Sequence, residues 1–132
     1  MRPLELARIA GTGVVARLKG KNKNAPLVAI RGDIDALPIQ EETGLPWAST
    51  HAGVMHACGH DVHASWAIDA AQLGTQNRAH GDVLIVLHPA EETGKGAMAL
   101  LESGILNGVA AILGAHANRR VWPCLWPNVF VY

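Results

Sequence analysis

The hydrophobic residues of this chain gather into three short continuous runs separated by longer polar stretches. The runs are LVAI at 27–30, VLIVL at 83–87 and VAAIL at 109–113. Because the runs are continuous rather than alternating, they predict strands that are covered on both faces, as in a parallel sheet. The segment GVVARLKG at 13–20 predicts a further strand, which ends in the polar turn KNKN and forms a hairpin with LVAI.

Two helical patterns lie between the predicted strands. The first runs from about Val62 to Leu73, and Gly74 follows it as a stop signal. Its apolar positions recur at helical spacing: Ala64, Ala67, Ile68 and Ala71. The second helix is predicted over 96–102. This alternation of strand and helix predicts an α/β fold, in which a mostly parallel sheet is flanked by helices.

Polar residues follow each predicted strand. The run at 27–30 leads into RGDID, the run at 83–87 into HPAEE, and the run at 109–113 into GAH. Ligands of open α/β sheets bind beyond the carboxyl ends of the strands, and parallel strands present these ends at one edge. The sequence therefore predicts that one edge of the sheet gathers Asp33, Asp35, Glu91, Glu92 and His116.

The segment MHACGHDVH at 55–63 precedes the first helix and is predicted to join this edge. It holds three of the chain's 7 histidines and one of its 2 cysteines. Cys58 and His60 lie at a predicted helix N-terminus, where the helix dipole favours a thiolate. Thiolate, imidazole and carboxylate ligands suit Zn²⁺, and carboxylate-rich sites also bind Mn²⁺. One of two adjacent glutamates can then bind metal while its neighbour takes a proton from metal-activated water.

Each of these residues taken alone also has a purely structural explanation. Cys58 can be a buried cysteine beside a surface histidine, and a glutamate pair is often the solvated start of a helix. His116 can be a hydrogen-bonded core residue, while Asp33 and Asp35 can form turns. What favours a functional site is that all of them fall at predicted strand ends together.

Composition narrows the choice of partner and location. A chain of 132 residues is long enough for one compact domain. Its 11 basic and 11 acidic residues give a net charge of zero, so charge gives no reason to expect nucleic acid or an anionic membrane as a partner. The N-terminus lacks a signal-peptide pattern and no apolar run approaches the length of a membrane span, which predicts a cytoplasmic protein.

Four longer segments resemble one known family. They are RGDIDALPIQEETGLPWAST, GVMHACGHDVHAS, HPAEETGKGAMALLESGIL and LGAHA. They are similar to the M20 metallopeptidase superfamily, and within it to the amidohydrolases that include N-acyl-amino-acid amidohydrolases, hippurate hydrolases and auxin-conjugate hydrolases. The resemblance implies part of the catalytic domain of a di-metal exopeptidase-like fold. It also implies that the amide bond of a small N-acyl amino acid is hydrolysed through a metal-activated water.

The same resemblance implies a role for each candidate residue. It makes Glu91 the general base and acid of the reaction. It implies four metal ligands, which are Cys58, His60, Glu92 and His116. It places four further residues in support of these ligands, namely Asp33, Asp35, Asp61 and His63. The expected cofactors are two divalent ions, Mn²⁺ or Zn²⁺, with Co²⁺ and Ni²⁺ also compatible.

The sequence departs from the family's usual pattern in two ways. Members of the family carry a lid domain and, after it, one more metal-binding histidine, whereas no histidine follows His116. We therefore expect the lid domain to be absent and one metal site to be incomplete. We also expect 1–117 to be a partial catalytic domain and 118–132 to be an atypical tail that is not native to the fold.

The sequence leaves two alternative functions open and also predicts self-association. The first alternative is a catalytically inactive remnant that binds at most one metal. The second is a thiol hydrolase in which Cys58 is the nucleophile and His60 or His63 is the base, without a metal. An incomplete sheet exposes apolar surface and strand edges, so we also expect the chain to form a homo-oligomer.

Overall fold

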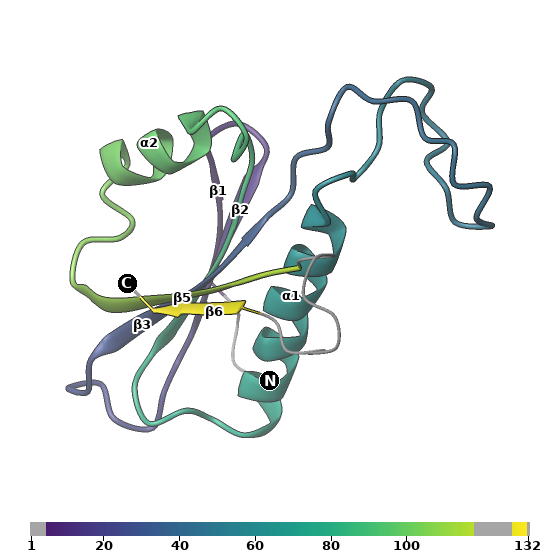
Figure 1. The fold of residues 1–132 in the computed structure, drawn as a ribbon. Helices are drawn as coiled ribbons and strands as arrows, with labels where there is room; N and C mark the ends of the chain where they lie inside the picture. Colours follow the sequence, from purple (N-terminus) through teal and green to yellow (C-terminus); the bar gives the residue numbers. More distant parts are fainter. Residues whose placement is uncertain (1–4, 118–127, 132) are drawn as a thin grey trace.

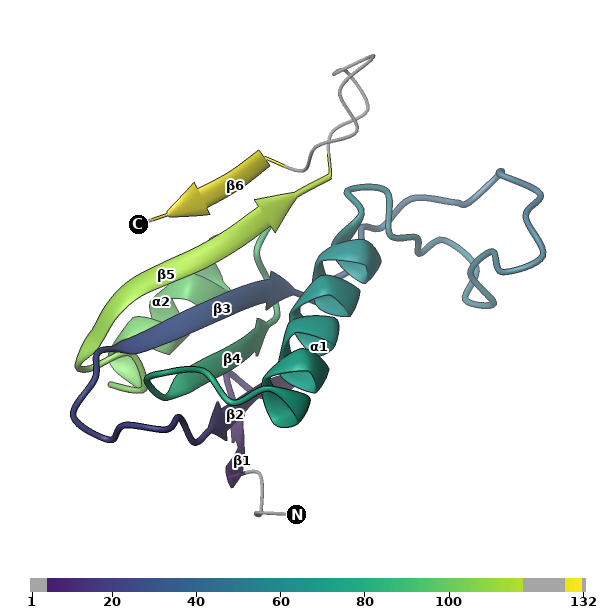
Figure 2. The same cartoon turned by 90° about the horizontal axis from the view of Figure 1, so that it is seen from below.

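A mixed sheet with the strand order β1-β2-β4-β3-β5-β6 forms the centre of the molecule (Figures 1 and 2). The computed structural model describes residues 5–117 and 128–131. The strands are β1 (Glu5–Ile9), β2 (Gly13–Leu18), β3 (Leu27–Asp33), β4 (Val83–His88), β5 (Val109–His116) and β6 (Asn128–Val131). The helices are α1 (His60–Gln76) and α2 (Lys95–Glu102). Neither of these helices is long and apolar enough to cross a bilayer.

The three continuous apolar runs form the parallel centre of this sheet. β3 pairs in parallel with β4 on one side and with β5 on the other, which confirms the parallel pairing predicted for these runs. The pairs β1–β2, β2–β4 and β5–β6 are antiparallel. The fold is therefore α/β as predicted, but its sheet is mixed rather than mostly parallel.

β2 does not form the predicted hairpin with β3. It forms a hairpin with β1 and pairs on its other side with β4. The loop after β2 bonds to the segment before β4, because the Lys21 amide donates to the carbonyl of Ala79 at 2.9 Å and the Gly20 amide donates to Asp82 Oδ1 at 2.8 Å. These contacts hold the polar turn against the start of β4 and leave β3 free to pair elsewhere.

The two helices cover opposite faces of the sheet (Figure 2). Successive residues of a strand point to opposite faces, so neighbours on β2 and β4 belong to different cores. The core on the face covered by α2 contains Val15, Ala29, Leu84, Val86 and Leu100. The core on the face covered by α1 contains Ala16, Leu18, Ala67 and Ile85.

α1 turns its two histidines toward the sheet. It begins two residues before the predicted start at Val62, and its buried residues are His60, His63 and Ala67. Ile68, which we expected in the buried stripe, is 53% exposed. The face of α1 that packs on the sheet is therefore turned about the helix axis from the face that the apolar residues predict. This buried face includes His60 and His63, which a hydrophobicity pattern counts as polar.

Gly32 lets α1 lie directly against β3. A Cβ atom on Gly32 would lie 2.8 Å from the backbone oxygen of His63 and 3.2 Å from Cα of Ala64. We expect Gly32→Ala to lower the free energy of unfolding by about 1–3 kcal/mol, because the helix backbone must move to make room. Urea unfolding followed by circular dichroism measures this loss.

Gly114 on the neighbouring strand β5 provides the control. A Cβ atom there would meet nothing nearer than Cδ of Arg31 at 3.8 Å, which is ordinary contact. We expect Gly114→Ala to change the free energy of unfolding by no more than about 0.5 kcal/mol. Equal losses in the two variants would contradict a close helix–strand contact at Gly32.

The connection from β3 to α1 is a long loop, residues 34–59, that extends away from the body of the molecule (Figure 1). Its two arms are joined near the base, where the amide of Leu37 donates to the carbonyl of Met55 at 2.9 Å. The chain therefore leaves β3 after Asp33 and enters α1 at His60, with the two arms of the loop side by side near its base.

Most of the predicted tail lies outside the described residues. Of 118–132, the structure describes the backbone of β6 (Asn128–Val131), which pairs with β5. The predicted division of the chain after residue 117 therefore stays a prediction.

Candidate metal centre

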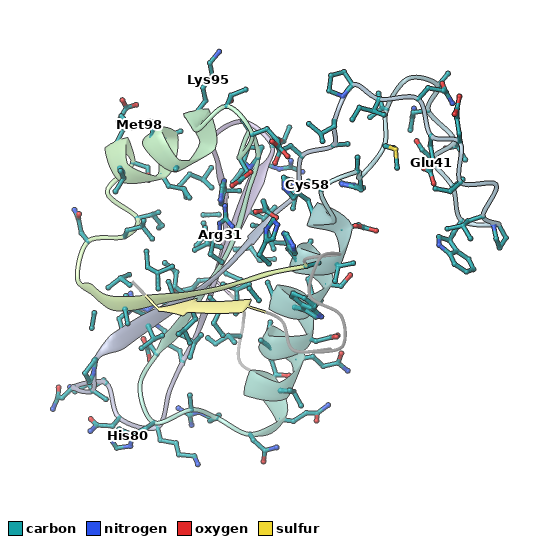
Figure 3. All side chains as sticks on the ribbon, in the orientation of Figure 1. Arg31, Glu41, Cys58, His80, Lys95 and Met98 are labelled. Atoms are coloured by element: carbon teal, nitrogen blue, oxygen red, sulfur yellow. The ribbon has the colours of Figure 1, made fainter. Side chains whose placement is uncertain are left out.

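The polar residues that follow the central strands lie at one edge of the sheet, beside the N-terminus of α1. Asp33 at the end of β3 is the register partner of His88 at the end of β4. Figure 3 shows the labelled Arg31 and Cys58 at this edge, near the base of the projecting loop, whereas Glu41 lies far out on the loop. The residues at the strand ends therefore lie at one edge of the sheet, as the strand-end reasoning predicts.

His60 is buried at this edge, with one ring nitrogen bonded and the other without a partner. Its Nδ1 lies 2.9 Å from the backbone oxygen of Asp35. Because a carbonyl oxygen can only accept, Nδ1 carries a hydrogen, and in the neutral ring Nε2 carries the lone pair. Among the described residues Nε2 has no hydrogen-bond partner, and it lies 3.7 Å from Oε2 of Glu91 and 3.7 Å from Oε1 of Glu92. A lone pair facing two carboxylates is unfavourable unless a proton or a cation lies between the nitrogen and the carboxylates.

Cys58 and Glu92 complete a set of ligand atoms around this nitrogen. One atom each of Cys58, His60 and Glu92 lies within 4.8 Å of the others, and we refer to these three residues as the candidate triad. Thiolate, imidazole and carboxylate are ligands that zinc binds in proteins. The candidate triad therefore fits a borderline divalent cation.

The thiol of Cys58 is protonated at neutral pH when no cation is present, contrary to the thiolate predicted at a helix N-terminus. Its pKa is raised to about 11 by burial first, then by the hydrogen bond to Glu92 and by the charges of Glu92, Glu91 and Asp33. Burial and these carboxylates outweigh the dipole of α1. Since the thiolate rather than the thiol is the nucleophile, this environment does not favour the metal-free thiol hydrolase.

A second group of potential ligands, Asp33, His60 and His63, is fully buried. Oδ1 of Asp33 accepts from Nδ1 of His63 at 2.7 Å, and its Oδ2 lies 2.7 Å from Nη1 of Arg31. The remaining nitrogen of His63 accepts from the amide of Ala117 at 2.9 Å. Asp33 and His63 therefore already use their coordinating atoms in the protein. In the candidate triad Nε2 of His60 has no hydrogen-bond partner among the described residues, so the triad is the better cation site.

Asp35 links the ligand histidine to the turn after β4. Its Oδ1 lies 3.2 Å from Nδ1 of His60, and its Oδ2 accepts from the amide of Glu92 at 3.3 Å. Burial raises the pKa of Asp35, but the amides of Glu91 and Glu92, its own amide and the nearby His60 outweigh burial and leave the pKa lowered. An ionised carboxylate in this position fixes the ring orientation of His60, as carboxylates behind metal-bound histidines do.

His116 and Asp61 lie apart from the candidate triad. His116 ends β5, and its ring centroid lies 4.9 Å from that of His63. It lines a cavity of about 510 Å³ together with Glu91, and it is not part of the candidate triad. Asp61 is exposed in the first turn of α1 and lines a hollow of the projecting loop. The structure brings Cys58, His60, Glu91 and Glu92 together and leaves His116 and Asp61 apart from them. The roles of all these residues stay predictions.

Comparison with known proteins shows the family of this chain. The model of a family described as peptidase family M20/M25/M40 matches residues 29–128. The chain belongs to this family. The resemblance predicted from its sequence segments is therefore confirmed.

Two curated relatives of this M20 chain show the branch of the family. The chain is 54% identical over 107 residues to N-acetylcysteine deacetylase of Bacillus subtilis (strain 168), an alignment that covers 80% of this chain and 28% of the relative. It is 42% identical over 116 residues to N-acyl-L-amino acid amidohydrolase of Geobacillus stearothermophilus, covering 86% of this chain and 31% of the relative. Both relatives belong with the predicted amidohydrolase branch. The chain spans about 28% to 31% of their length.

A solved relative supports the fold and the presence of metal in the family. The YXEP protein of Bacillus subtilis, described as a dinuclear metal-binding peptidase of family M20, superposes with a TM-score of 0.84 at 48% identity. The match covers 89% of this chain and 34% of that chain. The sheet and helices described above therefore match part of an M20 catalytic domain.

Sequence reasoning missed two residues that lie beside the candidate site, Arg31 and His88. Nε of Arg31 donates to Nε2 of His88 at 2.7 Å, and Nδ1 of His88 donates to the carbonyl of Pro89 at 3.1 Å. Burial lowers the pKa of His88, and the charge of Arg31 lowers it further. Strand periodicity could have pointed to Arg31. It lies two residues before Asp33, so the two side chains share one face of β3.

Proposed function

We propose that this chain carries a cation site and the general base of an M20 amidohydrolase that cleaves the amide bond of N-acyl amino acids. The observation that carries the proposal is the buried Nε2 of His60, which has no hydrogen-bond partner among the described residues and faces Glu91 and Glu92. The substrate class is proposed from the relatives, since two of them are named N-acetylcysteine deacetylase and N-acyl-L-amino acid amidohydrolase.

The candidate triad would hold the cation. Sγ of Cys58, Nε2 of His60 and a carboxylate oxygen of Glu92 supply one soft, one borderline and one hard donor, which suits Zn²⁺ or Mn²⁺ and also admits Co²⁺ or Ni²⁺. When bound, such a cation supplies Lewis acidity, which polarises a carbonyl and lowers the pKa of a water molecule.

The residues around the triad hold and move protons. Asp35 keeps the hydrogen of His60 on Nδ1, which leaves the lone pair of Nε2 available as a ligand. Glu91 is half-exposed, and its Oε2 lies 3.7 Å from the same Nε2. We propose that Oε2 of Glu91 takes a proton from the attacking water and returns it to the nitrogen of the leaving amine.

Cation binding without turnover is the second candidate function. It is favoured by the position of His116, which lies next to His63 and outside the candidate triad, so that the described residues gather three ligands around one point. A site of this kind would bind a cation and still lack the geometry for hydrolysis.

Hydrolysis assays with and without metal test the proposed function. We expect the purified chain to release free amino acid from N-acetyl and N-benzoyl amino acids when Mn²⁺ or Zn²⁺ is added, because the triad needs a cation to act. A chelator should abolish this release, and added metal should restore it. Amine release is measured by a ninhydrin or coupled assay.

Three other results have distinct meanings. Calorimetric metal binding without hydrolysis would favour the cation-binding function. Hydrolysis that survives the chelator would favour the thiol hydrolase. A chain that neither binds the metals nor hydrolyses the substrates would contradict both the site and the activity.

A further inference from the structure

The two adjacent glutamates are equally distant from the ligand histidine but have different partners. Oε2 of Glu91 and Oε1 of Glu92 each lie 3.7 Å from Nε2 of His60, so distance alone does not decide which one binds a cation. A carboxylate oxygen of Glu92 lies within 4.8 Å of Sγ of Cys58, the neighbouring ligand. Oε1 of Glu91 instead lies 3.5 Å from Nη2 of Arg31. The two carboxylates therefore differ in their neighbours: Glu92 lies beside another potential ligand, whereas Glu91 lies beside a positive charge.

The guanidinium of Arg31 is held in place by two buried residues and lies beside Glu91. Its Nη1 lies 2.7 Å from Oδ2 of Asp33 and its Nε donates to Nε2 of His88 at 2.7 Å. Asp33 and His88 are both buried at the ends of adjacent strands. A guanidinium is planar and its donors have a fixed geometry, so two short contacts fix the plane and with it the direction of the third donor. That third donor points toward Glu91.

We propose that Arg31 is a positioning residue that holds Glu91 by Oε1 and keeps it out of the ligand set of the cation. Glu92 is thereby left as the ligand, and Oε2 of Glu91 stays free to take a proton. Without Arg31, the Glu91 carboxylate can rotate toward the cation and bind it, and a carboxylate bound in this way is a weaker base. This inference rests on the proposed function for the roles of the two glutamates.

A double-mutant cycle on Co²⁺ affinity tests the proposal without any need for turnover. The variants are Arg31→Met, Glu91→Gln and the double variant, and calorimetry gives the Co²⁺ dissociation constant of each. We expect Arg31→Met to tighten Co²⁺ binding by about tenfold, a coupling of the size found between contacting groups. The reasons are that a positive charge is lost and that Glu91 becomes an additional ligand.

The Glu91→Gln background separates these two causes. There, Arg31→Met removes only the positive charge, and we expect binding to tighten by no more than about twofold, as for a partly exposed charge. Equal tightening in both backgrounds would overturn the proposal, because it would show that Arg31 acts by charge alone. The absorption spectrum of bound Co²⁺ should shift in Arg31→Met and should stay unchanged in the double variant.

Arg17→Met is the matched control for the loss of a hydrogen-bonded arginine. Arg17 on β2 donates to Asp82 at 2.9 Å, outside the candidate site. We expect this variant to leave the Co²⁺ affinity unchanged. A similar change in affinity there would show that the effect at Arg31 is a general result of lost stability.

Measurements of turnover test the role of Arg31 independently of the Co²⁺ affinities. If the chain hydrolyses its substrate, Arg31→Met should lower kcat by about 100-fold with little change in KM, and Arg31→Lys should restore part of this loss. Adding Arg31→Met to Glu91→Gln should cause little further loss, because both changes disable the same base. If the unmodified chain binds Co²⁺ but hydrolyses nothing, the proposed activity fails while the affinity cycle still decides the role of Arg31.

Discussion

Glu91→Gln is expected to lower the turnover of N-acyl amino acids by about 10³-fold while the chain keeps its cation. General base catalysis contributes a factor of this size, and an amide cannot take the proton. The cation should remain, because the candidate triad consists of Cys58, His60 and Glu92. Steady-state kinetics give the change in kcat, and calorimetry with Zn²⁺ gives the affinity of the same preparation.

Glu92→Gln is the matched comparison, since it makes the same chemical change one residue further along the chain. Glu92 is a member of the triad, so its loss should weaken Zn²⁺ binding itself. The two variants should therefore differ in affinity although both lose activity. Retained activity in Glu91→Gln, or equal loss of Zn²⁺ from both variants, would contradict the assigned roles.

The centre of the fold could be predicted from the sequence because burial on both faces leaves a direct pattern. LVAI, VLIVL and VAAIL are continuous apolar runs, and they form β3, β4 and β5 in parallel. The outer strand β1 left no such pattern, since its five residues are mostly exposed. The pairing of β2 with β4 is accompanied by backbone hydrogen bonds between the loops next to these strands. Hydrophobic periodicity gives no information about such bonds.

The candidate site could be located from the sequence but not resolved into its contacts. Parallel strands present their carboxyl ends at one edge, so the positions of Asp33, Glu91 and Glu92 followed from the strand ends alone. Which carboxylate stays free depends on side-chain hydrogen bonds. Asp33 is committed to His63 and to Arg31, and Arg31 had no reason to be singled out until its contacts were visible.

The predicted thiolate shows why a local rule failed. A helix N-terminus does favour negative charge, and Cys58 lies two residues before α1 begins. The rule takes no account of residues brought in from other strands. Here the turn after β4 places Glu91 and Glu92 near the thiol, so their charges and burial raise its pKa. A cation would reverse this balance, because it compensates for the carboxylates and stabilises the thiolate.

His60→Ala is expected to abolish the stabilisation of the fold by zinc. A ligand that binds only the folded state at 100 times its dissociation constant raises the free energy of unfolding by about 2.7 kcal/mol. The unmodified chain should show this increase, because Nε2 of His60 is the buried atom on which the cation would bind. The variant should show none. Urea unfolding in zinc and in chelator measures both values.

His80→Ala separates this effect from non-specific binding of zinc to histidines. His80 is exposed in the loop before β4, where it contacts Asn22 at 3.4 Å, far from the site in the sheet topology. This variant should keep the full zinc effect. If His60→Ala keeps it too, the buried Asp33 and His63 become the alternative ligands, and their mutual hydrogen bond at 2.7 Å would have to break for the cation to enter. Zinc stabilisation that is lost in Cys58→Ser but kept in Asp33→Asn would place the cation on the candidate triad.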